Sequence, residues 1–118
     1  MSVKRNTTPM LLVKVHMPFE KVRRIEFLFK KRKMDKFPEL LRKVYDADKG
    51  EIPIREGEDT EESFTVLCQL TAEETLRFPE GVVYMDTRPV LYDGTIPNTE
   101  IVEISVTPTL FGEVNEDD

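Results

Sequence analysis

Apolar side chains recur at every second position over much of this chain, a spacing that predicts β-strands rather than helices. The pattern covers residues 10–17, 22–31, 64–70, 82–89 and 99–107, where β-branched and aromatic residues are common. Each stretch therefore has one face suited to a buried core. The residues predicted to point inward include Leu11, Val13, Val15, Met17, Ile25, Phe27, Phe29, Phe64, Val66, Cys68, Leu70, Val102, Ile104 and Val106.

Residues 37–45 fit two different structures. Pro38 followed by good helix formers is typical of a helix start. The alternation from Leu41 to Tyr45 is instead typical of a strand. We favour a strand over about residues 41–46.

One short helix is predicted over about residues 72–78. Thr71 can accept a hydrogen bond from the backbone N–H of Glu74, and the Glu74 carboxylate can accept one from the backbone N–H of Thr71. This reciprocal arrangement is a capping box, which marks a helix N-terminus. Pro79 and Gly81 are expected to end the helix.

The segments between the predicted strands are polar. Residues 46–63 are acidic and interrupted by glycine and proline, which predicts a long loop with at most a short edge strand at 52–55. Asp93-Gly94 predicts a tight turn before the last strand. Residues 113–118 are acidic with little to bury, so we expect a disordered tail there.

The size and composition of the chain favour one domain. With 118 residues and 39% hydrophobic content, a single core over residues 1–112 is expected. Several strands with one helix predict an all-β fold, either an antiparallel sandwich or a small barrel. The more specific prediction is an antiparallel immunoglobulin-like β-sandwich of about six to seven strands.

Residue types that commonly perform catalysis or bind metals are scarce. The chain has one histidine and one cysteine, too few for a zinc site. His16 is expected to lie on the open face of a strand, and Cys68 to be an inert core thiol. Residues 46–51 resemble a calcium loop faintly but lack Gly and Glu at the required positions. We therefore expect a protein that is not an enzyme and has no cofactor or metal.

Charge is distributed unevenly along the sequence. Residues 1–45 hold 13 Lys/Arg and 4 Asp/Glu, whereas residues 46–118 hold 4 and 19, within a net charge of −6. We therefore predict a basic and an acidic surface, which would steer contacts with protein partners or with a second copy. The candidate interaction residues are Arg23, Arg24, Lys30, Lys31, Arg32 and Lys33 on the basic side, and Glu58, Asp59, Glu61 and Glu62 on the acidic side.

The basic segment 21–33 suggests nucleic-acid binding as an alternative, because lysines and arginines alternate there with aromatic residues. Against this, Phe27 and Phe29 are needed for the core and cannot also stack on bases. The acidic remainder of the chain would also repel nucleic acid. We expect no membrane partner, because no apolar run approaches the roughly 20 residues of a spanning helix.

The order of motifs in the C-terminal half is distinctive. The run Leu70-Thr71-Ala72-Glu73-Glu74-Thr75-Leu76-Arg77-Phe78 leads to Gly81 and a strand over 82–88, then to the turn at 93–94 and a strand over 101–106. This order, with Arg5-Asn6-Thr7-Thr8-Pro9 before a strand, resembles small proteins encoded among the tail and baseplate genes of prophages in Gram-positive bacteria. Their β-sandwich is similar to the N-terminal domain of phage upper baseplate proteins.

The resemblance implies a structural or accessory role in tail or baseplate assembly, with no catalytic residues. It implies other phage proteins, or copies of this chain, as partners. The expected location is the bacterial host cytoplasm during assembly, and then the virion.

Overall fold

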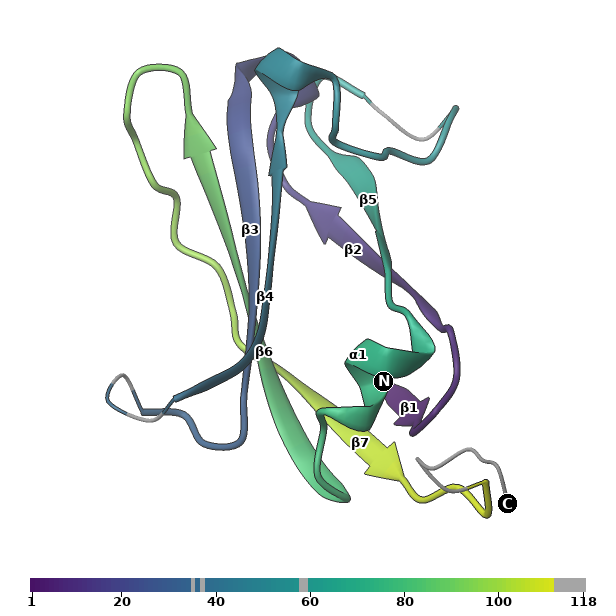
Figure 1. Cartoon of the computed structure of the whole chain (residues 1–118). Coiled ribbons are helices and arrows are strands. Elements are labelled where there is room, and N and C mark those ends of the chain that lie inside the picture. Colours follow the sequence, from purple (N-terminus) through teal and green to yellow (C-terminus); the bar gives the residue numbers. More distant parts are fainter. Residues whose placement is uncertain (35, 37, 58–59, 112–118) are drawn as a thin grey trace.

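The computed structural model describes residues 1–34, 36, 38–57 and 60–111, which form mostly β-structure with little helix (Figure 1). The strands are β1 (Ser2–Lys4), β2 (Met10–Val15), β3 (Val22–Lys30), β4 (Glu39–Asp46), β5 (Phe64–Gln69), β6 (Gly81–Leu91) and β7 (Val102–Thr107). The helical segments are α1 (Ala72–Leu76) and the 3-10 turns η1 (Phe19–Lys21) and η2 (Ala47–Lys49). The acidic tail predicted at residues 113–118 lies outside the described residues.

The strands form two sheets. One has five strands in the order β1-β7-β6-β3-β4, and the other pairs β2 with β5. In the described part of the chain every strand pair is antiparallel except β1 with β7, which is parallel. The prediction of an antiparallel fold is therefore wrong for this pair. β1 has three residues with one buried side chain, Val3, which is too short for a repeating apolar pattern, and it pairs with a strand far along the sequence.

β3 lies between β6 and β4 and places its predicted core face inward. Ile25, Phe27 and Phe29 are fully buried, which confirms the alternation. The ring centroids of Phe29 and Phe78 lie 5.3 Å apart. Phe78 is the second residue after the end of α1. This contact attaches the α1 region to the middle of the five-stranded sheet.

Buried side chains from both sheets form one hydrophobic core. β2 contributes Leu11 and Val15, and β5 contributes Phe64 and Val66. Ile52, which is 8% exposed, joins the same core from the long connection after η2. The predicted inward residues that are only partly buried are Val13, Met17 and Val102.

Residues 39–46 form the strand β4, which confirms the favoured alternative for this stretch. The strand begins at Glu39, two residues before the expected start. Its helix-forming residues adopt a strand because the chain pairs with β3 and because Leu41 is buried. Tertiary packing of this type commonly overrides intrinsic helix propensity.

The predicted capping box before α1 is present. Thr71 Oγ1 accepts a hydrogen bond from the Glu74 N–H at 3.1 Å, and Glu74 Oε1 accepts one from the Thr71 N–H at 2.8 Å. The helix ends at Leu76 rather than at 78. The N–H of Phe78 donates to the Thr75 carbonyl at 3.2 Å, a tighter 3-10 turn that directs Phe78 into the core.

The long connection predicted at 46–63 contains η2 and a single bridge in its described part. The bridge pairs Ile54 with Val66, in place of the edge strand predicted at 52–55. The backbone N–H of Leu67 donates to the Pro53 carbonyl at 2.8 Å beside it. The connection is therefore attached along one edge of β5.

Thr75 ties α1 to the segment between β1 and β2. Its fully buried hydroxyl accepts a hydrogen bond from the Thr7 N–H at 3.2 Å. The same oxygen lies 3.1 Å from the Thr7 carbonyl and 3.0 Å from the Ala72 carbonyl, either of which can accept its proton. One side chain thus connects α1 to the backbone of Thr7, 68 residues away in the sequence.

Replacing Thr75 by valine keeps the shape of the side chain and removes this hydroxyl. Leaving the partly buried Thr7 N–H without its partner should cost about 1–3 kcal/mol in unfolding free energy. Urea denaturation of Thr75→Val measures the loss. Thr75→Ser, which keeps the hydroxyl, should lose less, and equal midpoints for wild type and Thr75→Val would contradict the role.

Candidate interaction surfaces

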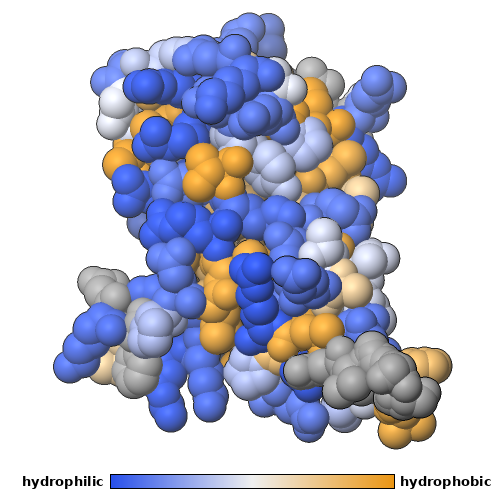
Figure 2. All heavy atoms as spheres, in the orientation of Figure 1, coloured by the Kyte–Doolittle hydropathy of each residue, from blue (hydrophilic) through white to orange (hydrophobic). Residues whose placement is uncertain are grey.

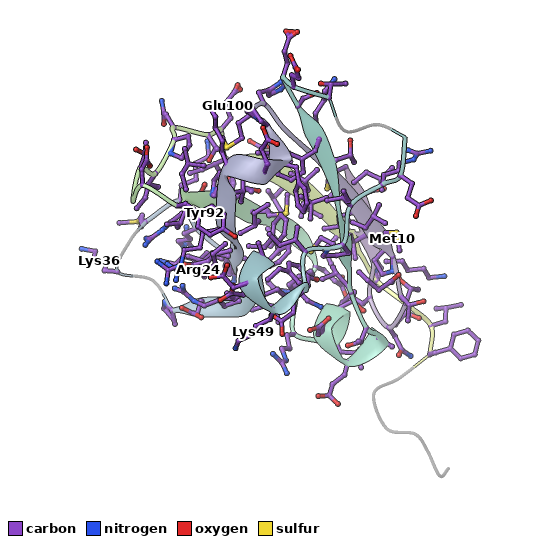
Figure 3. All side chains as sticks on the ribbon, turned by 90° about the horizontal axis from the view of Figure 1, so that it is seen from above. Met10, Arg24, Lys36, Lys49, Tyr92 and Glu100 are labelled. Carbon is purple, nitrogen blue, oxygen red and sulfur yellow. The ribbon has the colours of Figure 1, made fainter. Side chains whose placement is uncertain are left out.

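Five cations gather at the tip of the β3–β4 hairpin. Lys30, Lys31, Arg32, Lys33 and Lys36 are called here the basic tip, and all except the partly buried Lys30 are exposed. The hairpin projects from the end of the molecule opposite η2 (Figure 1), and Lys36 extends outward from it (Figure 3). Such a concentration of cations on a projecting element attracts acidic surfaces.

Local contacts position two members of the basic tip. Lys33 Nζ lies 5.4 Å from the ring centroid of Tyr84 on β6, a cation–π contact. Lys30 Nζ donates a hydrogen bond to the Met34 carbonyl at 3.3 Å. The pairing of β3 with β4 shifts register between Phe29 and Lys30, where the strands leave the sheet. The basic tip therefore begins where regular pairing ends.

Arg23 and Arg24, predicted to belong to the same surface, lie at the opposite end of β3. Arg24 and Lys30 are six residues apart in an extended strand, or roughly 20 Å. Arg24 also has a partner, because its Nε donates to Glu26 Oε2 at 2.9 Å. The structure thus divides the predicted basic residues into two groups, and four of the six belong to the basic tip.

Glu26 joins two arginines on the outer face of the five-stranded sheet. Besides Arg24, it binds Arg42 of β4, whose Nη1 donates to Glu26 Oε1 at 2.9 Å. Arg42 Nε also donates to Glu39 Oε2 at 3.1 Å, and this hydrogen bond lowers the pKa of the Glu39 carboxyl. No sequence pattern indicates this network, because Glu26 and Arg42 become neighbours only through the pairing of β3 with β4.

The predicted acidic residues belong to the connection between η2 and β5. Glu61 and Glu62 are exposed, and Glu58 and Asp59 lie outside the described residues. Thr60 Oγ1 organises the turn by accepting hydrogen bonds from the N–H groups of Glu62 and Ser63 at 3.1 and 3.0 Å. This connection and the basic tip lie at opposite ends of the molecule (Figure 1).

The described surface also exposes apolar side chains. Figure 2 shows a mostly hydrophilic face with separate hydrophobic areas. The largest exposures belong to Leu110 and Phe111 after β7, at 102% and 75%. Met10 and Leu12 on β2 are 48% and 46% exposed.

A groove of about 410 Å³ runs beside β2. Residues 13–17 line one side, and residues 97–100, Thr87 and Val102 line the other. His16 and Glu100 both border the groove and are exposed. The exposure of His16 is as predicted, but its predicted place on a strand is wrong, because β2 ends at Val15 and His16 lies in the bend that follows. Within the described chain no hydrogen bond or ion pair joins His16 to Glu100. The oriented base that nucleophilic catalysis requires is thus not assembled from this pair.

Two carboxylates that suggested a calcium loop are engaged in local structure. Asp46 Oδ1 accepts a hydrogen bond from the Asp48 N–H at 2.9 Å and caps η2. Asp48 Oδ1 accepts one from the Tyr92 hydroxyl at 2.9 Å. The residues that the structure describes contain no group of three or more His, Cys, Asp or Glu side chains placed to hold a metal ion. No helix among them has the length and apolar character needed to cross a membrane.

Cys68 is fully buried on the core face of β5, as predicted. Burial raises the pKa of its thiol to about 11 and the pKa of the neighbouring Tyr45 hydroxyl to about 12. The thiolate is the reactive form of cysteine. Burial therefore slows reaction of Cys68 in two ways, because it blocks the access of reagents to the sulfur and keeps the thiol protonated.

We expect Ellman's reagent at pH 8 to modify Cys68 far more slowly in the native protein than in denaturant, because the buried thiol is neutral there. The rate of absorbance change under the two conditions measures the difference. Complete native modification within the time needed for free cysteine would show that β5 opens readily.

An ion pair joins β4 to α1. Lys43 Nζ lies 3.0 Å from Glu74 Oε1 and also donates to the Gln69 carbonyl at 2.7 Å. Burial alone would raise the pKa of Glu74. The hydrogen bonds from the Thr71 backbone and from Lys43 outweigh it, so the pKa of this carboxyl lies below its usual value.

This lowered pKa makes stability depend on pH through Glu74. Its contribution is fully present above the pKa of the unfolded chain, about 4.3, and is lost as pH falls through the lower pKa of the folded chain. Glu74→Gln should therefore lower the unfolding free energy at pH 7, and the difference from wild type should shrink towards pH 3. Urea denaturation at both pH values tests this, with the exposed Glu73→Gln as control. A difference independent of pH would contradict it.

Comparison with known proteins finds similarity to solved structures. No model of a protein family matches the chain, and no curated protein matches it. The chain is similar to the extracellular portion of mouse CD200RLa, with 15% sequence identity and a TM-score of 0.37. The match covers 92% of this chain, which spans 54% of the length of the other. A likeness at this level assigns no family and no function.

Proposed function

We propose that this protein is a non-enzymatic structural or accessory protein of a phage or prophage that acts in tail or baseplate assembly. In this proposal it docks through the basic tip onto an acidic surface of a partner protein. The proposal of docking rests on one observation, the presence of five cations on one projecting hairpin. Charge complementarity of this kind speeds encounter and fixes orientation more than it adds affinity.

The proposed place in a tail or baseplate rests on the resemblance in the C-terminal half. Its supports are the capping box before α1, the strand that follows Gly81, and the last strand after the Asp93-Gly94 turn. These elements occur in the order that the resemblance requires.

We also propose that the two sheets pack as an immunoglobulin-like sandwich. In variable-type immunoglobulin domains the strands named G, F, C and C′ share one sheet. The order β7-β6-β3-β4 fits that arrangement, with β2 and β5 as the facing sheet. The single core that collects buried residues from both sheets supports it.

A protein partner is favoured over nucleic acid because of the aromatic residues near the basic tip. Binding of single-stranded nucleic acid relies on aromatic faces on which bases stack. Phe27 and Phe29 are fully buried, and Lys33 lies over the ring of Tyr84. These three aromatic rings, all among the described residues, are thus buried or covered and are not free to stack on bases.

The test uses the purified products of the genes adjacent to this one as binding probes. We expect at least one to bind, and the charge reversal Lys31→Glu/Arg32→Glu/Lys33→Glu to slow its association about tenfold or more, as measured by biolayer interferometry. The matched control is Lys21→Glu/Arg23→Glu/Lys49→Glu, which makes the same change in charge near η1 and η2. The control should retain binding.

Two results would contradict the proposal. Equal losses in both variants would assign the effect to net charge instead of to the basic tip. A gel shift with DNA or RNA at 150 mM salt, abolished only by reversal of the basic tip, would instead favour nucleic-acid binding.

A further inference from the structure

β2 has one free edge. β5 pairs with one side of it, and the N–H of Leu70 donates to the Pro9 carbonyl at 3.0 Å next to this pairing. Hydrogen-bonded pairs alternate in an antiparallel ladder, so the N–H and C=O groups of Leu12 and Lys14 point away from β5. No hydrogen bond from elsewhere in the described chain reaches these groups. An open edge of this kind is a template for another strand.

The groove of about 410 Å³ follows this edge. Its lining includes three consecutive residues of β2, Val13, Lys14 and Val15, and consecutive side chains of a strand point to opposite faces. A groove lined by all of them therefore runs along the edge of the strand. Val13, Pro97 and Val102 supply apolar surface on both sides, so an extended segment with apolar side chains fits the groove.

The chain itself carries such a segment directly after β7. Leu110 and Phe111 have the highest exposures among the large apolar side chains of the described residues. The Phe111 N–H donates to Thr109 Oγ1 at 3.1 Å, a local bond that pairing with another strand would replace. Lys14 and Glu100 both border the groove, so its charges are balanced and the fit rests on the apolar side chains.

This segment cannot return to the groove of its own molecule. Val102 lines the groove, and Thr107 lies five residues farther along β7, or roughly 16 Å away. Thr107 is held there by pairing with Lys4 of β1. The four residues up to Phe111 span at most about 14 Å, so the backbone of this segment falls short of Val102. Where this segment is the occupant, it comes from a second copy.

We propose that residues 109–111 of one copy enter the groove beside β2 of a second copy. Leu110 and Phe111 are buried there, and their backbone adds to the free edge at Lys14. Because the groove and the segment are different surfaces, the contact is head-to-tail and builds a closed ring or a filament. It uses neither the basic tip nor the partner of the proposed function, so either proposal can fail without the other.

Disulfide crosslinking tests the geometry directly, since the native Cys68 is buried. Lys14→Cys and Thr109→Cys are prepared as separate full-length variants and mixed under mild oxidation. The mixture should form a disulfide-linked heterodimer that neither variant forms alone. Lys49→Cys mixed with Thr109→Cys is the control and should remain unlinked. A homodimer of Lys14→Cys would indicate pairing between two β2 edges and overturn the proposal, as would the absence of any crosslink.

Sedimentation over a thousandfold range of concentration tests the energetics. The wild type should associate, and Leu110→Ser/Phe111→Ser should weaken the association about tenfold or more. Val44→Thr on β4, where the side chain is 45% exposed, is the matched control and should leave association unchanged. Both changes lie at exposed positions, and circular dichroism verifies the fold. A monomeric wild type, or association unaffected by the double substitution, would overturn the proposal.

Discussion

Burial of one face of β3 is the constraint on which the rest of the structure depends. Ile25, Phe27 and Phe29 have no exposed surface, and a shift of one residue in pairing would turn Arg24 and Glu26 into the core instead. The register with β4 and β6 is therefore strongly specified. That register decides where the hairpin begins to project, and so where the cations beyond β3 lie.

The parts of the fold that the sequence predicts are those encoded by neighbouring residues. The alternation in β3, β5 and β7 identifies their core faces, and the four residues from Thr71 to Glu74 contain the whole capping box. β4 was ambiguous because its residues suit both helix and strand, and only pairing with β3 decides between them. β1 and the groove depend on segments far apart in sequence, so no local pattern indicates them.

Uneven charge along the chain does not become uneven charge in space by itself. β3 carries cations at both ends, and an extended strand separates residues that are close in sequence. Arg24 is drawn into a network with Glu26, whereas Lys31 to Lys33 remain exposed in the hairpin. The two proposed contacts accordingly rely on different physics, long-range attraction at the basic tip and burial of apolar side chains at the groove.

The parallel pairing of β1 with β7 sets an order of events during synthesis. Ser2 lies opposite Ser105, so β1 leaves the ribosome long before the strand with which it pairs. Until residues 102–107 emerge, Val3 has no site in the core and the β6 side of the sheet ends in unpaired backbone. Contacts of such long sequence separation form slowly. A change in β1 would therefore act on the closing step of folding and leave the hairpin of β3 and β4 untouched.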